Sequence, residues 1–186
     1  MPRYVALLRG INVGGRNKVA MADLRRVAAS LGHTEVATYI QSGNVVFTSP
    51  DSDITGLADA LEQEIARSLA VRPAVVVLSR AGLARVIADN PFPQETNPRC
   101  LHVVFRRQEM TPGAIAAITT AQQSARARGS RDEAIVVGRT LFLRTPDGLG
   151  RSELAAQLAR SSGQAAGTAR NWATVTRLMA MLDPAA

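Results

Sequence analysis

Cysteine, aromatic residues and long apolar stretches are all scarce in this chain of 186 residues. The single cysteine, Cys100, cannot form an internal disulfide and has no histidine near it in the sequence, so we interpret it as a packing residue. Aromatic residues make up 4% of the chain, too few for an obvious base-stacking platform. No apolar run approaches the ~20 residues that span a membrane, and no signal-peptide pattern opens the chain. We therefore expect a cytoplasmic protein without a membrane partner.

Metal-binding clusters and cofactor fingerprints are also missing from the sequence. His33 and His102 each lack a second ligand at metal spacing, so we expect both to be structural or exposed. The dinucleotide-binding pattern GxGxxG is absent. Gly10 and Gly15 have the spacing of the phosphate-binding pattern GxxxxGK[ST], but Arg16–Asn17 replaces its lysine and its hydroxyl residue. The sequence therefore predicts neither a metal nor a cofactor.

Lysine is almost absent too, because Lys18 is the only lysine among the 22 cationic residues and the others are arginine. A lysine kept against this bias, in a loop rich in glycine and asparagine, favours a site that uses a compact ammonium group. Chance retention explains it equally well. The net charge is +7, but the arginines are dispersed among acidic residues. This distribution favours a modest excess of solvated positive charge over a dedicated polyanion-binding tail.

The first 49 residues contain most of the unusual chemistry. The apolar run Tyr4–Leu8 predicts a strand buried on both faces. Residues 9–18 then form a loop whose composition suits positive φ angles and exposed backbone N–H groups, which can hold an anion. Helical spacing predicts a helix that stops at Gly32, and residues 35–48 read as a hairpin whose turn is Gln41–Asn44.

The polar residues of this loop and turn are the first candidate site. We expect them to converge on one surface cleft, because they are more numerous than turning the chain requires. The alternative, that the polar residues of the turn only close it, stays open. The candidate ligand-binding residues here are Arg9, Asn12, Lys18, Gln41, Ser42 and Asn44.

Two later helix starts repeat the pattern of turn, cation and helix. The first helix start follows Gly148. The second is the start of the last helix, where we expect Thr168 to be the N-cap and Trp172 to lie on the buried face. Residues 161–167 between these helices are expected to be a flexible connector. Helix N-termini can bind anions, although capping and packing alone would also explain these residues. The candidates of this half are Arg151, Arg170 and Asn171.

Several motifs together resemble a known family. RGINVGG, YIQSGNVVF, NPFP, GLGRSELA and TARNWATVTRL are similar to the domain-of-unknown-function 1697 family of bacterial proteins, and the resemblance runs from Met1 to about Leu182. It implies an α+β fold of two related subdomains and no particular activity.

The order of elements leads to the same fold class. The first half reads βαββαβ, the ferredoxin-like order, and βαββ recurs in the second half. We predict an α+β protein with two ferredoxin-like (βαββαβ-type) subdomains, at residues 1–79 and 80–186, which can share strands and end in a C-terminal helix.

The leading functional expectation is binding of a phosphate-bearing small molecule or a nucleic-acid backbone through the loop that contains Lys18. The first alternative is a metal-independent enzyme in which Lys18 acts as electrostatic stabiliser, base or nucleophile. The second is a protein-interaction module without a small ligand. No feature of the sequence indicates an oligomeric state.

Overall fold

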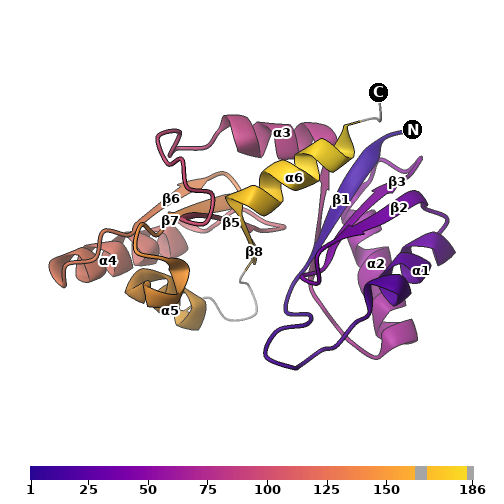
Figure 1. Ribbon diagram of the computed structural model, residues 1–186, viewed down its shortest axis with the longest axis horizontal. Helices are drawn as coiled ribbons and strands as arrows, with labels where there is room; N and C mark the ends of the chain where they lie inside the picture. Colours follow the sequence, from indigo (N-terminus) through magenta and orange to yellow (C-terminus); the bar gives the residue numbers. More distant parts are fainter. Residues whose placement is uncertain (162–166, 184–186) are drawn as a thin grey trace. The chain divides into compact units, whose positions relative to one another are not determined.

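The computed structural model describes residues 1–161 and 167–183, which form two compact units (Figure 1). Unit 1 contains residues 1–85 and 177–183, and unit 2 contains the described residues from 86 to 176. Each unit has its own four-stranded antiparallel sheet with helices. The predicted connector at residues 161–167 falls mostly outside the described residues, and separate domains divided at residue 79 stay a prediction.

Unit 1 has the predicted order βαββαβ. Its sheet runs β2-β3-β1-β4, so the first strand lies in the middle and pairs antiparallel with β3 and β4. The elements are β1 (Arg3–Leu8), α1 (Met21–Ser30), β2 (Thr34–Tyr39), β3 (Asn44–Thr48), α2 (Ile54–Leu69) and β4 (Val75–Ser79).

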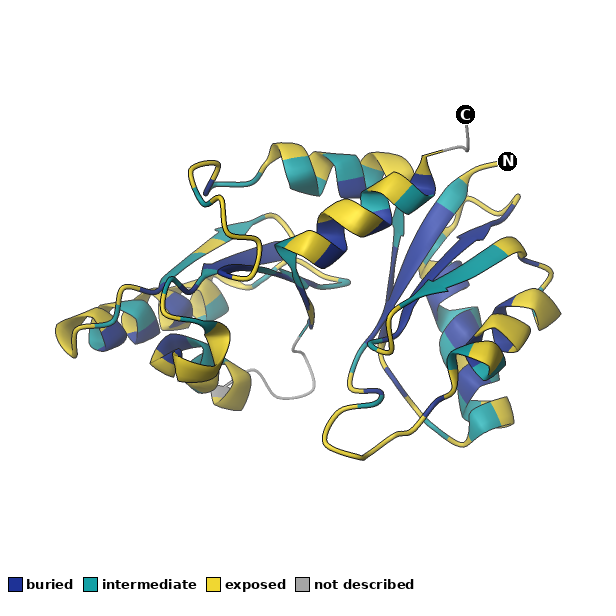
Figure 2. Cartoon of the chain, viewed as in Figure 1, coloured by how far each residue is buried: buried dark blue, intermediate teal, exposed yellow. Residues whose placement is uncertain are grey.

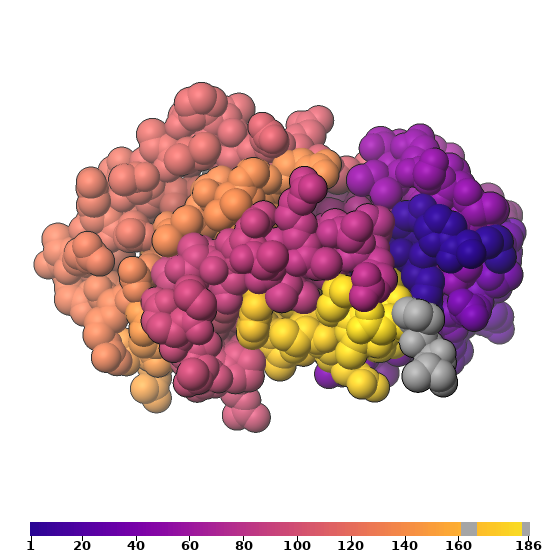
Figure 3. Space-filling view, turned by 90° about the horizontal axis from the view of Figure 1, so that it is seen from above, coloured from indigo at the N-terminus to yellow at the C-terminus, as the bar shows by residue number. Residues whose placement is uncertain are grey.

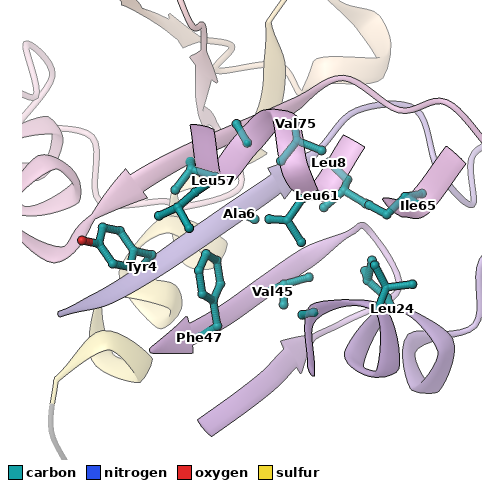
Figure 4. Packing of buried hydrophobic residues seen from close by; sticks show 14 of the residues in the cluster. Tyr4, Ala6, Leu8, Leu24, Val45, Phe47, Leu57, Leu61, Ile65 and Val75 are labelled. Carbon is teal, nitrogen blue, oxygen red and sulfur yellow. The ribbon is translucent and has the colours of Figure 1, made fainter. Parts of the chain in front are cut away.

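One face of the unit 1 sheet packs against α1 and α2 (Figure 4). Tyr4, Ala6 and Leu8 of β1 point to this side, because alternate residues of a strand face the same way. They belong to one cluster with Leu24 of α1 and Leu61 of α2, which are fully buried. Removing a large apolar side chain from water contributes roughly 1.5–3 kcal/mol. This layer therefore fixes the end of β1, from which the candidate loop departs.

The opposite face of β1 is buried as well. Val5 and Leu7 are both 0% exposed. Within unit 1, the end of α6 (Trp172–Leu182) lies beside the start of the chain (Figure 3). Arg3 donates to the backbone oxygen of Asp183 at 3.0 Å. Arg80 binds the Asp183 carboxylate at 2.6 and 2.8 Å. The prediction of a strand buried on both faces is confirmed.

Unit 2 repeats the topology of unit 1. Its sheet order, β6-β7-β5-β8, corresponds strand for strand to that of the first sheet, so the predicted fold of two ferredoxin-like subdomains is confirmed. Helix α3 (Arg80–Ala88) precedes it. Its elements are β5 (Leu101–Phe105), α4 (Pro112–Ala127), β6 (Glu133–Val137), β7 (Thr140–Arg144), the 3-10 helix η1 (Leu149–Arg151), α5 (Glu153–Ser161) and β8 (Thr168–Asn171).

Strand β8 corrects the prediction that Thr168 caps the last helix. Residues 168–171 pair antiparallel with β5, and α6 begins only at Trp172, which is half-buried rather than buried. The cap is Asn171, whose Oδ1 accepts from the backbone N–H of Thr174 at 2.8 Å. The physical reason is that β5 offers a row of backbone groups, and satisfying them outweighs the weak local preference of four residues.

Both histidines are withdrawn from water, as structural residues. His33 stacks on Phe47 with ring centroids 4.4 Å apart, and its Nε2 has no hydrogen-bond partner among the described residues. Burial lowers the pKa of His33, and the negative charge of Asp51 opposes this in part. Burial also lowers the pKa of His102 in β5. Each ring therefore resists protonation in the folded protein.

These pKa shifts predict a loss of stability in mild acid. Because the unfolded chain binds protons at its histidines more readily, the stabilisation is complete above about pH 6.5 and falls as the pH drops below that value. The free energy of unfolding, measured by urea titration, should decrease from about pH 7.5 to about pH 5.5. A double variant, His33→Gln with His102→Gln, should have a flatter profile over that range. Identical profiles for the two proteins would contradict the assignment.

Candidate functional site

The loop after β1 is a short two-stranded arm rather than an open cradle. Val13 and Arg16 form an isolated antiparallel bridge, and the Arg16 N–H donates to the Val13 oxygen at 3.1 Å. Gly14 and Gly15 join them with φ angles of 58° and 76°, as two-residue hairpin turns require. A side chain added at either glycine would meet nothing within 4 Å. Residues 10–20 are hereafter called the loop arm. The tip of the loop arm, at the two glycines, is therefore open to its surroundings.

The base of the loop arm is held by the side chain of Asn12. Its Nδ2 donates to the backbone oxygens of Val19 and Gln41, each at 2.9 Å, and its Oδ1 accepts from the Val19 N–H at 2.9 Å. Asn12 has a φ of 54°, a conformation that asparagine tolerates better than most residues. One side chain thus closes the loop arm on itself and joins it to the β2–β3 turn.

The β2–β3 turn differs from the predicted Gln41–Asn44 turn. Ile40–Gly43 connect the strands, and Asn44 is the first residue of β3, with a side chain that is 0% exposed. Asn44 Nδ2 donates to the Tyr39 oxygen and to Ser42 Oγ, both at 2.9 Å. Its buried amide therefore closes the turn from inside, and the expected surface cleft cannot include it.

Close backbone packing joins the turn to β1. The Leu8 N–H donates to the Gly43 oxygen at 2.8 Å. Gly43 has a φ of 75°, and a β-carbon there would lie 2.8 Å from Leu8 Cβ and from Ile11 Cδ1. Only glycine fits this position, because the contact atoms belong to buried side chains of the strand end and of the loop arm.

The remaining unit 1 candidates differ in exposure. Lys18 and Gln41 are exposed, whereas Arg9 and Ser42 are half-buried. Among residues 1–161 and 167–183, the side chains of Lys18 and Arg16 form no hydrogen bond or ion pair. The structure thus brings Asn12, Gln41 and the turn together and leaves the Lys18 ammonium facing water.

The surroundings of the loop arm carry positive charge without nearby acids along the chain. No aspartate or glutamate occurs before Asp23, and Asp23 forms an ion pair with Arg26. Figure 2 shows most of the loop arm as exposed. Its two cations, Arg16 and Lys18, form no ion pair with residues 1–161 or 167–183, and they produce a positive potential that attracts anions.

Two apolar residues of this region were not predicted to matter. Val13 is 65% exposed, and Ile40 is 51% exposed with a φ of 48°. A positive φ is strongly disfavoured for a β-branched residue. No sequence signal pointed to Ile40, because the alternating pattern predicted it inside the strand. The Val-Gly-Gly-Arg segment does match a two-residue hairpin turn and could have indicated the arm.

The candidates of unit 2 lie in a different setting. Arg170 is in β8, 7% exposed, and donates to Thr168 Oγ1 and to the Ala169 oxygen, each at 2.7 Å. Burial lowers the pKa of its guanidinium to about 10. The prediction that Arg170 and Asn171 occupy the first turn of a helix is therefore wrong. Arg170 is an interior cation, and Asn171 is a helix cap.

Arg151 is the exposed candidate of unit 2. It ends η1, just before Ser152, whose Oγ accepts from the Ala155 N–H at 2.8 Å and so caps α5. Asp147 lies near it: a hydrogen bond from Arg131 lowers the pKa of Asp147, and the positive charge of Arg151 lowers it further. Arg151 thus already interacts electrostatically with an acid, whereas Lys18 has no such interaction among the described residues.

Residues 1–161 and 167–183 lack two features that would indicate a function. No group of three or more histidine, cysteine, aspartate or glutamate side chains could hold a metal ion there. No helix in those residues is long and apolar enough to cross a membrane.

Comparisons with known proteins give a family but no activity. A family model described as "Protein of unknown function (DUF1697)" matches residues 1–142. The chain belongs to this family. The later motifs at 148–155 and 168–178 lie beyond the matched range. A solved structure, the conserved bacterial protein SP0830 from Streptococcus pneumoniae, is 26% identical with a TM-score of 0.74, covering 98% of this chain and 99% of that one. No curated protein matches.

The packing around Gly43 predicts a position-specific cost of adding a methyl group. Gly43→Ala should lower the free energy of unfolding by about 2–4 kcal/mol, because it combines an unfavourable φ with two close contacts. Gly138→Ala is the matched control: its φ is 55°, but a β-carbon would meet nothing within 4 Å, so about 1 kcal/mol is expected. Equal costs in urea denaturation would show that the contacts at Gly43 are not tight.

The backbone of Ile40 predicts a stabilising substitution. Asparagine adopts positive φ more easily than a β-branched residue, and the Ile40 side chain is largely exposed, so Ile40→Asn should raise the free energy of unfolding by about 1 kcal/mol. Val36→Asn in the preceding strand should be destabilising instead. A lower denaturation midpoint for Ile40→Asn would mean that the isoleucine is stabilising where it is.

Proposed function

We propose that the loop arm binds the phosphate groups of a nucleic-acid backbone or of a phosphate-bearing small molecule, with Lys18 and Arg16 as the contacting cations. One observation carries the proposal: both side chains are exposed on an anchored arm, and neither has a hydrogen-bond or ion-pair partner among the described residues. Exposed cations without a paired acid attract anions. The open glycine tip lets a phosphate approach the backbone N–H groups.

The candidate residues take different roles in this proposal. Lys18 contacts phosphate directly, and the amide of Gln41, which is also exposed, is a second candidate contact. Asn12 and Asn44 act as positioning residues, because their side chains bond to the chain itself. Arg9 and Ser42 support the ends of β1 and of the turn. In this proposal Arg170 and Asn171 make no phosphate contact, and Arg151 is a candidate contact of unit 2 alone.

The exposure of Lys18 favours binding over catalysis. A lysine that acts as a base or nucleophile works where neighbouring groups or exclusion of water make the neutral amine available. Lys18 is exposed and has no hydrogen-bonded partner in the described chain. An exposed ammonium on a loop suits electrostatic contact with phosphate, whose strength depends on salt.

The salt dependence of binding tests this function. Affinity for a short fluorescein-labelled DNA strand, measured by anisotropy at several salt concentrations, should fall linearly on logarithmic axes, with a slope of about 0.7 per phosphate contact. Lys18→Gln and Arg16→Gln should each reduce the slope by about that amount. Arg126→Gln on α4 is the matched control, since it removes one exposed charge elsewhere. If the control weakens binding as much as Lys18→Gln does, the net charge and not the loop arm is responsible.

A further inference from the structure

Two exposed apolar residues are sequence neighbours of the two residues whose hydrogen bond anchors the loop arm. Val13, 65% exposed, follows Asn12, and Ile40, 51% exposed, precedes Gln41. Asn12 Nδ2 and the Gln41 oxygen are 2.9 Å apart, so the segments that carry the two apolar residues are held together. Arg16, the bridge partner of Val13, adds a cation to the same segment. This surface is therefore both apolar and positive.

Folding does not explain why residue 40 is isoleucine. The position has a φ of 48°, which asparagine or glycine would adopt with less strain. Its side chain is also mostly exposed, so burial within unit 1 gives little in return. Backbone strain that persists without a structural benefit is concentrated at binding sites. An aliphatic group at this point is therefore explained best by contact with a ligand.

Phosphate alone gives these aliphatic groups nothing to contact. A ligand that suits the whole surface presents apolar faces next to its phosphates. Unpaired bases do so, because every base has an apolar face and is attached to a charged backbone, whereas a duplex stacks those faces against each other. The chain contains only one tryptophan and 4% aromatic residues, so aliphatic side chains would take the place of an aromatic platform.

We infer that the loop arm binds single-stranded nucleic acid, with unpaired bases lying on Val13 and Ile40 while the phosphates contact Lys18 and Arg16. This inference rests on the proposed phosphate-binding function and adds the class of ligand. Single strands of RNA and of DNA both present unpaired bases next to phosphates, so the inference covers either. Charge complementarity favours this ligand over an apolar peptide, because no acid among the described residues forms an ion pair with either cation.

Matched strands with and without bases test the inference. A short DNA strand and an abasic strand of the same length have the same phosphates, so only base contacts distinguish them. The intact protein should bind the base-containing strand at least about fivefold more tightly than the abasic strand. This factor follows from the apolar area that two half-exposed aliphatic groups can bury against bases. Val13→Ser and Ile40→Asn should each reduce this preference while leaving the affinity for the abasic strand unchanged. Lys18→Gln should weaken binding of both strands.

The controls separate the possible failures. Ile40→Asn should raise the melting temperature, so its loss of preference could not result from unfolding, and Ile115→Gln, at an exposed isoleucine of α4, should preserve the preference. Equal affinity for both strands would overturn the base contact and leave the phosphate-binding function standing. The base contact would also be overturned if the preference survived in Val13→Ser and Ile40→Asn. The same holds if the protein bound a duplex of the same sequence more tightly than the single strand. Absence of binding to either strand would overturn the phosphate-binding function itself.

Discussion

The side-chain amide of Asn12 is the interaction on which the proposed site depends. It links the loop arm to the backbone of Val19, where the chain enters α1, and to the backbone of Gln41 in the β2–β3 turn. Each such hydrogen bond contributes about 0.5–1.5 kcal/mol, and together they hold a loop with several left-handed residues in one conformation. Without them, the loop arm that carries Lys18 and Arg16 would keep its internal hydrogen bonds but lose its side-chain link to the β2–β3 turn.

This anchoring works because both attachment points are themselves fixed. β1 is one of the two inner strands of the unit 1 sheet and is buried on both faces, so the loop arm leaves from a strand that is packed on every side. The turn is held against β1 by the contact between Gly43 and Leu8 and by the buried amide of Asn44. Pre-organisation of this kind reduces the entropy that is lost when a ligand binds.

The sequence predicted the fold well because the fold follows from patterns that act locally. Apolar runs and helical spacing correspond to strands and helices of the structure, and local side-chain caps at Asp53 and Thr111 start α2 and α4. β8 was missed because its four residues have little strand character, and its pairing with β5 is a long-range effect. Composition indicated the loop arm but not its hairpin form, and no local pattern predicts a positive φ at Ile40. Burial of Asn44 and Arg170 likewise depends on tertiary neighbours.

The two units share a topology, yet among the described residues the arm and the glycine-locked turn occur in unit 1 alone. In unit 2 the corresponding hairpin turn at Gly138 is open, and the candidate Arg170 is buried. A ligand of the proposed kind should therefore bind to unit 1.

The most direct measurement of the binding site is residue-resolved: an NMR titration of the protein with a short single-stranded DNA. The account predicts that amide shifts concentrate in residues 10–20 and 40–43 and saturate together. Shifts confined to unit 2, or no shifts in the loop arm at saturating strand, would contradict it.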